Sequence, residues 1–174
     1  MELYEAIAKR RIVRDFKDED VPLKTVEKII GAGLKAPTLE ILKRTLTDGT
    51  PQQKMYAAAM PRQYTMLFSA PYVILPFFKT TPGVMKPDSV SSLNPLSSIW
   101  CVVENIFLAA TAEGLACSMR IPVGSEGPNA ALAVGAPDGY MLPCYIGIGV
   151  PADDAPEIEQ IEYTAKQKVH FGKW

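Results

Sequence analysis

The chain has little of what side-chain catalysis or covalent cross-linking requires. Its 174 residues include one histidine, His170, and three cysteines at 101, 117 and 144. The cysteines are odd in number, widely spaced and form no C-x-x-C pair, which favours reduced, mostly buried thiols over a disulfide framework or a zinc site. With a single histidine, the chain offers little opportunity for a Ser/His or Cys/His catalytic pair. We therefore expect no catalytic side chain and no metal, and any enzymatic chemistry would belong to a bound cofactor.

An excess of positive charge is also lacking. Lys and Arg number 18 against 19 for Asp and Glu, a formal net charge of −1. This balance argues against an extended nucleic-acid-binding face. No apolar run reaches the roughly 18 residues of a membrane span, and the first five residues lack the basic-then-apolar order of a signal peptide. We expect a cytoplasmic protein with neither nucleic acid nor membrane as a partner.

The composition present is that of an ordinary globular domain. Hydrophobic residues make up 48% of the chain and charged residues 21%, values far from the signature of disorder. The length is sufficient for one domain with its own hydrophobic core and short for two such domains. The sequence therefore predicts a single domain over residues 1–174.

Periodicity predicts an α+β arrangement of helices and buried strands. The helix 97–114 is apolar nearly all round, so it should be central or lie in a subunit interface. The loop 79–95 is long enough to be functional or mobile. The other expected helices span 2–10, 22–36, 39–49, 50–61 and 129–135, and the expected strands span 72–78, 115–121 and 141–151.

Positive charge gathers locally where the first predicted helix ends, at Lys9, Arg10, Arg11 and Arg14. Side chains from a helix end and the extended segment after it can converge on a small anion, and the planar fork of arginine suits phosphate oxygens. The alternative is a solvated helix end, where cations complement the helix dipole. Spacing alone favours this second interpretation.

Four stretches in order resemble the nitroreductase family of flavin oxidoreductases. The first runs from AIAKRRIVRDF through VP to a helix ending in Ala36-Pro37-Thr38. The second is the central helix SSIWCVVENIFLAATAEGLACSMRI. The third, VGAPDGYMLPCYIGIGVP, matches a late helix, turn and strand, and the fourth is the basic and aromatic tail AKQKVHFGKW. Any one of these motifs is weak, but their order over almost the whole chain is fairly specific.

The resemblance implies a nitroreductase-like α+β fold, in which a central, mostly antiparallel sheet is flanked by helices in an intertwined homodimer. Residues 152–174 would extend onto the partner subunit. The implied activity is transfer of hydride from NAD(P)H through flavin mononucleotide (FMN) to a small organic acceptor such as a nitroaromatic or a quinone. Two alternatives stay open, a degenerate flavin-binding protein without turnover and a phosphate- or nucleotide-binding regulatory module.

The resemblance also nominates cofactor-binding residues. The basic run would hold the flavin phosphate through Arg10, Arg11 and Arg14, with Lys166 and Lys168 near the C-terminus as further partners. A loop containing Pro122, Val123 and Gly124 would pass over the flavin ring, where backbone amides can hydrogen-bond it. The segment that begins at Asn94 would enter the site, from the partner subunit.

Two departures from the family pattern bear on flavin affinity. Ile12 stands where the family usually has serine, and loss of one hydroxyl hydrogen bond would weaken binding by about 1 kcal/mol. After Thr38 the chain runs directly into Leu39, without the x-x-Asn-x-Gln stretch and the strand that usually follow. Either this chain lacks the segment or the sequence omits it.

Overall fold

The computed structural model describes residues 1–33, 63, 65–80, 84–156 and 164–172. The helices predicted over 39–49 and 50–61, and the question of a missing segment after Thr38, fall outside these ranges. The described helices are α1 (Leu3–Lys9), α2 (Leu23–Gly33), the 3-10 helix η1 (Val90–Leu93), α4 (Asn94–Ala112), α5 (Glu126–Ala133) and α6 (Ala165–Lys168). The strands are β1 (Tyr72–Ile74), β2 (Phe78–Lys79), β3 (Ala116–Arg120), β4 (Tyr140–Met141) and β5 (Tyr145–Gly149).

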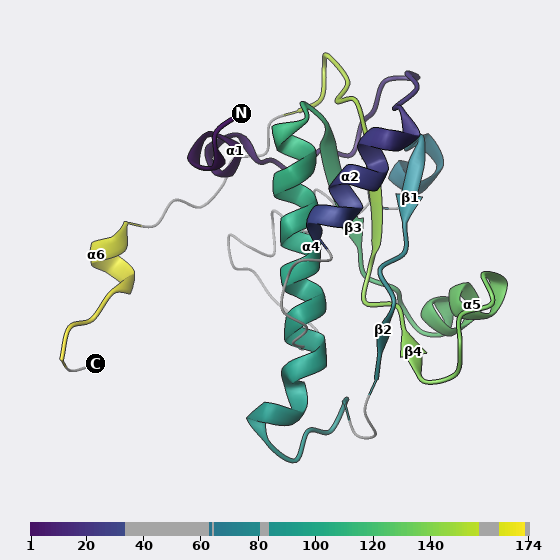
Figure 1. Ribbon diagram of the computed structural model, residues 1–174, viewed down its shortest axis with the longest axis vertical. Helices are drawn as coiled ribbons and strands as arrows, with labels where there is room; N and C mark the ends of the chain where they lie inside the picture. The colour runs from purple at the N-terminus through teal and green to yellow at the C-terminus, as the bar shows by residue number, and fades with distance from the viewer. Residues whose placement is uncertain (34–62, 64, 81–83, 157–163, 173–174) are drawn as a thin grey trace.

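Helix α4 is the centre of the described structure (Figure 1). One stripe of it, which includes Ile99, Val103, Ile106 and Ala110, is almost completely buried. Helix α2 packs against it, and so do α1 and β3. This burial confirms the central position predicted for the apolar helix, because a helix with few polar positions must cover most of its circumference.

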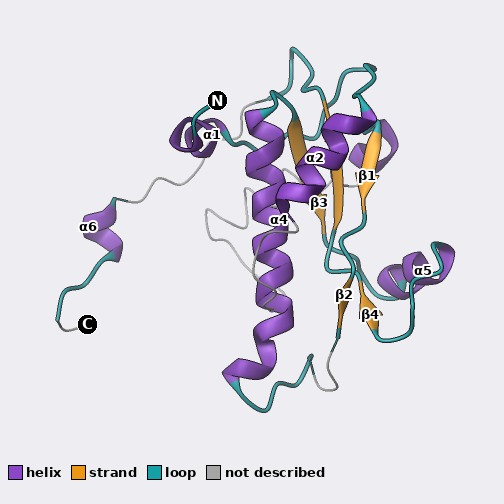
Figure 2. Ribbon diagram, viewed as in Figure 1, coloured by secondary structure: helices purple, strands orange, loops and turns teal. Residues whose placement is uncertain are grey.

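The sheet lies against α4 and has the order β1-β5-β3, with both pairs antiparallel (Figure 2). Side chains alternate between the two faces of a strand. Cys117 of β3 with Ile146 and Ile148 of β5 therefore share the face that joins the core cluster with α4. Helices beside a mostly antiparallel sheet confirm the predicted α+β class.

The opposite face of β5 has glycine at two of its three positions, 147 and 149. A Cβ atom at Gly149 would lie 2.8 Å from Pro71 Cδ and 3.0 Å from Phe16 Cδ1, and one at Gly147 would lie 3.2 Å from Ala70 Cβ. Glycine is needed at both positions because other chain segments approach the strand closely here. The bare face thus lets the N-terminal segment at Phe16 lie directly on the sheet.

Proline interrupts both strands that were predicted as continuous. Pro76 divides the 72–78 stretch into β1 and β2, and Pro143 divides the 141–151 stretch into β4 and β5. Proline offers no N–H to a ladder, so the pairing breaks in the stretch that contains the two prolines. Three residues, 75–77, lie opposite four, 142–145, because Ile74 pairs with Ile146 but Phe78 pairs with Met141. This one-residue mismatch is a bulge, and it diverts β2 and β4 into a separate two-stranded ribbon.

Two predicted boundaries were wrong by one turn. Helix α4 begins at Asn94 with Pro95 in its first turn, directly after η1, so the predicted 79–95 loop contains ordered helix. Ser89 caps η1, with its side chain accepting from the Ser92 amide at 3.3 Å and its own amide donating to Ser92 Oγ at 3.4 Å. Helix α5 begins at Glu126 rather than near 129, and Gly135 with φ +66° follows its end, as predicted.

By length and composition alone, the stretch Val90–Ala112 could cross a membrane, with a mean hydropathy of 1.3. Helix α2, helix α1 and strand β3 all pack against it. Core helices of globular domains pass the same test of length, so the stretch carries no argument for a membrane span.

Substituting Gly149→Ala should lower the free energy of unfolding by about 1–3 kcal/mol, because the added methyl group would overlap the Pro71 ring. Gly147→Ala should lower it less, since its nearest neighbour is 3.2 Å away and is a methyl group. Urea unfolding of both variants measures the difference. Equal stability of the two variants and the parent would show that the close approach does not constrain the sheet.

Candidate functional site

The arginine segment crosses one end of the sheet. Ile12 forms a parallel bridge to Cys117 of β3, and the Val13 amide donates to the Cys117 carbonyl at 3.3 Å. Further along, the Lys17 amide donates to the Val150 carbonyl at 2.9 Å. These backbone bonds fix the segment beside the start of β3 and the end of β5. The nominated arginines therefore belong to a segment that is held to the sheet by backbone hydrogen bonds.

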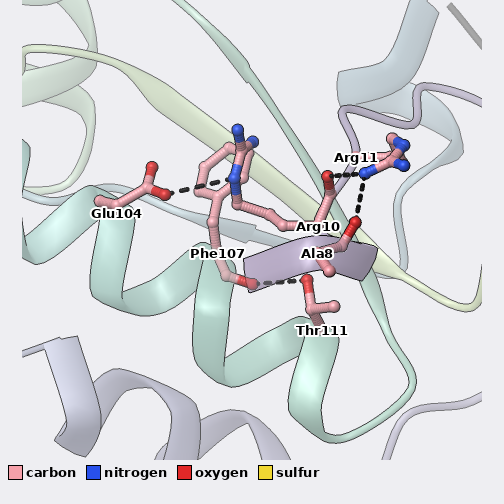
Figure 3. Close-up of polar contacts among 6 residues, drawn as sticks. All are labelled: Ala8, Arg10, Arg11, Glu104, Phe107 and Thr111. Atoms are coloured by element: carbon pink, nitrogen blue, oxygen red, sulfur yellow. Dashed lines mark hydrogen bonds and ion pairs between the residues drawn. The ribbon is translucent and has the colours of Figure 1, made fainter. Parts of the chain in front are cut away.

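The three nominated arginines have different surroundings, and Figure 3 shows those of Arg10 and Arg11. Arg10 Nε lies 3.2 Å from Glu104 Oε1 on α4. Arg11 donates to the carbonyl oxygens of Ala8 at 2.7 Å and of Arg10 at 2.8 Å. Arg14 is 7% exposed. Arg11 thus caps the end of α1, as the helix-end interpretation predicts, whereas the burial of Arg14 is not that of a solvated charge.

A cavity of about 500 Å³ lies toward the other end of β3. Its walls come from α4, from the β2/β4 ribbon, from the start of α5 and from the loop 121–125. Among the described residues that line it, none carries a charge. The residues are Thr80, Val84, Met85, Leu96, Trp100, Ile121, Pro122, Gly124, Gly127, Pro128, Tyr140, Met141, Leu142 and Pro143. The cavity therefore suits a neutral, flat or apolar group, and it includes two nominated residues, Pro122 and Gly124.

A second and larger cavity, of about 1070 Å³, lies between α2, α4 and the β1–β2 segment. It is also mainly apolar, and of the described residues that line it Lys79 alone is charged. None of the nominated loop or arginine residues borders it. We therefore take the smaller cavity as the candidate site.

Two charged residues that the sequence analysis missed hold the loop at the cavity. Arg120, 6% exposed at the end of β3, has its NH2 group 2.7 Å from Glu126 Oε1. The other carboxylate oxygen of Glu126 accepts the Val123 amide at 2.8 Å. The hydrogen bond from Arg120 and, to a smaller extent, that from the Val123 amide hold the pKa of the Glu126 carboxyl below its ordinary value. The sequence signal was an arginine that ends a strand six residues before a glutamate that begins a helix.

The loop itself turns at Gly124. Its φ of +58° is followed by φ −86° at Ser125, and the Glu126 amide donates to the Val123 carbonyl at 3.2 Å. These φ values suit a type II′ turn, in which glycine is favoured at the first central position. Pro122 is buried, and an added Cβ at Gly127 would lie 3.6 Å from it. The loop is therefore a defined turn fixed at both ends.

The remaining nominated residues lie elsewhere in the single chain. Asn94 is exposed at the first position of α4, two residues before the cavity-lining Leu96. Lys166 and Lys168 belong to α6, which lies beyond α1 and apart from the sheet (Figure 1). One chain alone does not bring these residues to the arginine segment.

The thiols are unsuited to nucleophilic chemistry at two of three positions. Burial raises the pKa of Cys117 and of Cys144 to about 12, so both stay protonated. Cys101 is exposed on α4, which differs from the burial expected for most of the cysteines. Because α4 is apolar nearly all round, the sequence could not show that the part of the helix that carries Cys101 is exposed.

Comparison with known proteins finds similarity in structure only. No model of a known protein family and no curated protein sequence matches the chain. Solved structures do match. One is an FMN- and NADPH-dependent nitroreductase from Sphigopyxis sp. strain HMH, at a TM-score of 0.73 and 17% identity over 100% of both chains. The chain has the nitroreductase fold.

Two other solved structures share this fold. An iodotyrosine deiodinase bound to FMN and 3-iodo-L-tyrosine matches at a TM-score of 0.73 and 19% identity, over 99% of this chain and 100% of the other. A BluB-like flavoprotein from Clostridium difficile 630 matches at 0.71 and 20% identity, again over 99% and 100%. The nitroreductase fold inferred from the sequence motifs is thus confirmed, and at these identities the likeness concerns the fold.

The depressed pKa of Glu126 predicts a specific loss of stability in acid. A carboxylate with a lowered folded-state pKa contributes stability above its ordinary value of 4.5, and this contribution disappears as the pH falls below that value. Glu126→Gln should therefore reduce the steepness with which the free energy of unfolding decreases below about pH 4.5. Urea unfolding at several pH values measures it. An identical acid limb in parent and variant would contradict the ion pair.

Proposed function

We propose that the protein is an FMN-dependent oxidoreductase of the cytoplasm that transfers hydride from NAD(P)H, through the flavin, to a small organic acceptor of nitroaromatic or quinone type. One observation carries the proposal. An arginine-bearing segment and an uncharged cavity lie at opposite ends of the same strand, β3, in a chain with the nitroreductase fold.

The separation of the two ends suits an elongated ligand with an anion at one end and a flat ring at the other. Ile12 bridges to Cys117, and Pro122 lines the cavity five residues further along the strand direction. At about 3.3 Å per residue, this stretch of extended chain spans roughly 17 Å. An FMN molecule has this division, with a phosphate at one end and an isoalloxazine ring at the other.

The donors at the anionic end fit a phosphate group chemically. Arginine offers paired N–H donors in a plane that match two phosphate oxygens. The ion pair of Arg10 uses Nε, which is compatible with a bidentate contact through its terminal nitrogens. Arg14 adds a positive charge in a site shielded from water, where charge attraction is stronger than at the surface. Ile12 contributes no hydrogen bond of the kind a serine would.

The uncharged cavity would contribute orientation and exclusion of water. When bound, FMN supplies the chemistry of accepting and releasing hydride, so no side-chain acid or base is needed. Trp100 and Tyr140 offer flat faces against which a ring can stack, and Pro122 and Pro143 give rigid walls. Because no charged side chain lines the cavity, an acceptor without net charge is favoured there.

We also propose a homodimer, in which the C-terminal segment and the start of α4 reach the partner's site. Apolar side chains exposed in the single chain support it. On α1, Leu3 is 62% and Tyr4 is 84% exposed, and in the tail Phe171 is 92% exposed. A partner covering these side chains would account for them, since large contiguous apolar surface is uncommon on a monomer. It would also account for how Asn94, Lys166 and Lys168 could approach a flavin.

Removing the two arginines that are not committed to capping α1 should release the cofactor. Arg10→Ala with Arg14→Ala should weaken FMN binding by about 10²- to 10⁴-fold, because each charge-assisted contact contributes about 1.5–3 kcal/mol. Lys9→Ala is the matched control, since Lys9 lies in the same basic cluster but pairs with Glu5 at 2.6 Å. Fluorescence quenching of added FMN gives the dissociation constants.

Turnover is tested on the parent protein under anaerobic conditions. Addition of NADH or NADPH should bleach the visible absorption of bound flavin, and a quinone should restore it. Bound flavin that neither coenzyme bleaches would favour the degenerate binding protein. A colourless protein that binds inorganic phosphate but no FMN would favour the regulatory module.

The homodimer is tested by truncation. A chain ending at residue 156 should sediment as a monomer, or as a weakened dimer, whereas the full chain should sediment as a dimer at the same micromolar concentration. The reason is that the truncation removes Val169 and Phe171, which are exposed in the single chain and which we propose to pack on the partner subunit. Sedimentation velocity measures both, and a full-length monomer at high concentration would refute the dimer.

A further inference from the structure

The loop 121–125 is fastened to the protein by one carboxylate. Glu126 Oε1 receives Arg120 NH2 at 2.7 Å, and Glu126 Oε2 receives the Val123 amide at 2.8 Å. A third bond holds the same residue from the sheet, because the Tyr145 hydroxyl donates to the Glu126 carbonyl at 3.2 Å. Arg120 and Tyr145 are opposite each other on β3 and β5. The loop is thus tied to the most rigid part of the fold.

A carboxylate is the only common side chain that satisfies this arrangement. Both groups that face Glu126 are donors, and each oxygen of the ionised carboxylate accepts from one of them. A glutamine has one acceptor oxygen, so its amide nitrogen would face the other donor. An aspartate is shorter by one methylene and cannot span both at these distances. The identity of residue 126 therefore determines the position of the loop.

This arrangement also withholds one backbone amide of the loop from a ligand. The Val123 amide points to Glu126 and is occupied. Gly124 follows it, lines the cavity and makes no hydrogen bond through its amide within the described part of the chain. Its φ of +58° is the conformation of the turn that Glu126 closes.

We propose that Glu126, anchored by Arg120, is the positioning residue for the cofactor ring: by occupying the Val123 amide it presents the Gly124 backbone as the donor of loop 121–125 toward a ring in the cavity. The inference rests on the proposed function. Glu126 itself touches no ligand, and it acts through the position of the loop. Hydrogen bonds from a fixed amide to a flavin ring alter its spectrum and its reactivity toward hydride.

The competing explanation is purely structural, because a glutamate in the first turn also stabilises α5 through the helix dipole. The two explanations differ in what a substitution changes. Loss of a helix-end charge lowers stability alone. Loss of a positioning residue changes the ring environment while leaving the phosphate contacts, at the other end of β3, intact.

The experiment compares Glu126→Gln and Arg120→Lys with the parent, each saturated with FMN. Glu113→Gln is the matched control, since Glu113 also forms an ion pair, with Lys28, but does not line the cavity. Three quantities are measured: the dissociation constant for FMN, the visible spectrum of the bound flavin, and the rate of anaerobic bleaching by the coenzyme. Hydrogen exchange of the Val123 amide reports the state of the loop without any flavin.

For Glu126→Gln we expect faster exchange at Val123, a shifted visible band and a bleaching rate reduced about 10- to 100-fold, the usual effect of a misplacement near 1 Å. The FMN dissociation constant should change by no more than about threefold. Arg120→Lys keeps one donor for Glu126 and should show an intermediate rate. Glu113→Gln should match the parent in all four measurements.

Unchanged spectrum and bleaching rate in Glu126→Gln would overturn the inference and leave the proposed function standing. Equal losses of FMN affinity and of stability, without a selective change in the visible spectrum or the bleaching rate of the bound flavin, would overturn it as well. If Glu126→Gln does not fold, Arg120→Lys decides the matter in the same way. If the parent binds no FMN, the proposed function fails, and this inference fails with it.

Discussion

The close contact between the bare face of β5 and the segments that lie on it is the constraint on which the rest depends. Gly147 and Gly149 leave room for Phe16, Ala70 and Pro71, and at Gly149 an added Cβ would lie only 2.8 Å from Pro71. Phe16 in turn brings the chain from α1 to the sheet, where backbone hydrogen bonds hold residues 12–17. The position of the arginines therefore follows from the absence of two side chains on a neighbouring strand.

Strand β3 links the two parts of the candidate site. Its start carries the bridge to Ile12, and its end carries Arg120, from which the loop over the cavity is held. The core face of the same strand packs against α4 through Cys117. The distance between the arginine segment and the cavity is consequently set by the five residues of this strand.

Much of the fold could be predicted from the sequence because its elements carry strong local patterns. The apolar helix 97–114, the strand 115–121 and the glycine after α5 were each placed within a turn of their observed position. The interruptions at Pro76 and Pro143 could not be placed, because hydrophobic periodicity does not show which strand pairs with which. The sequence motifs pointed to the loop at 122–124 but not to Arg120 and Glu126, since this pair spans the end of a strand, a turn and the start of a helix, which no single periodicity connects.

The mismatch of three residues against four at the two prolines has a consequence for how this chain can vary. In β5 the even-numbered residues Ile146 and Ile148 face the core, as Cys144 does just before the strand, whereas in β4 the odd-numbered Met141 packs against the core. Deleting one residue between 141 and 146 would exchange the faces on which Tyr140 and Met141 lie. The length of this short stretch thus constrains the fold as the identity of a core side chain does, and insertions should be tolerated elsewhere before they are tolerated here.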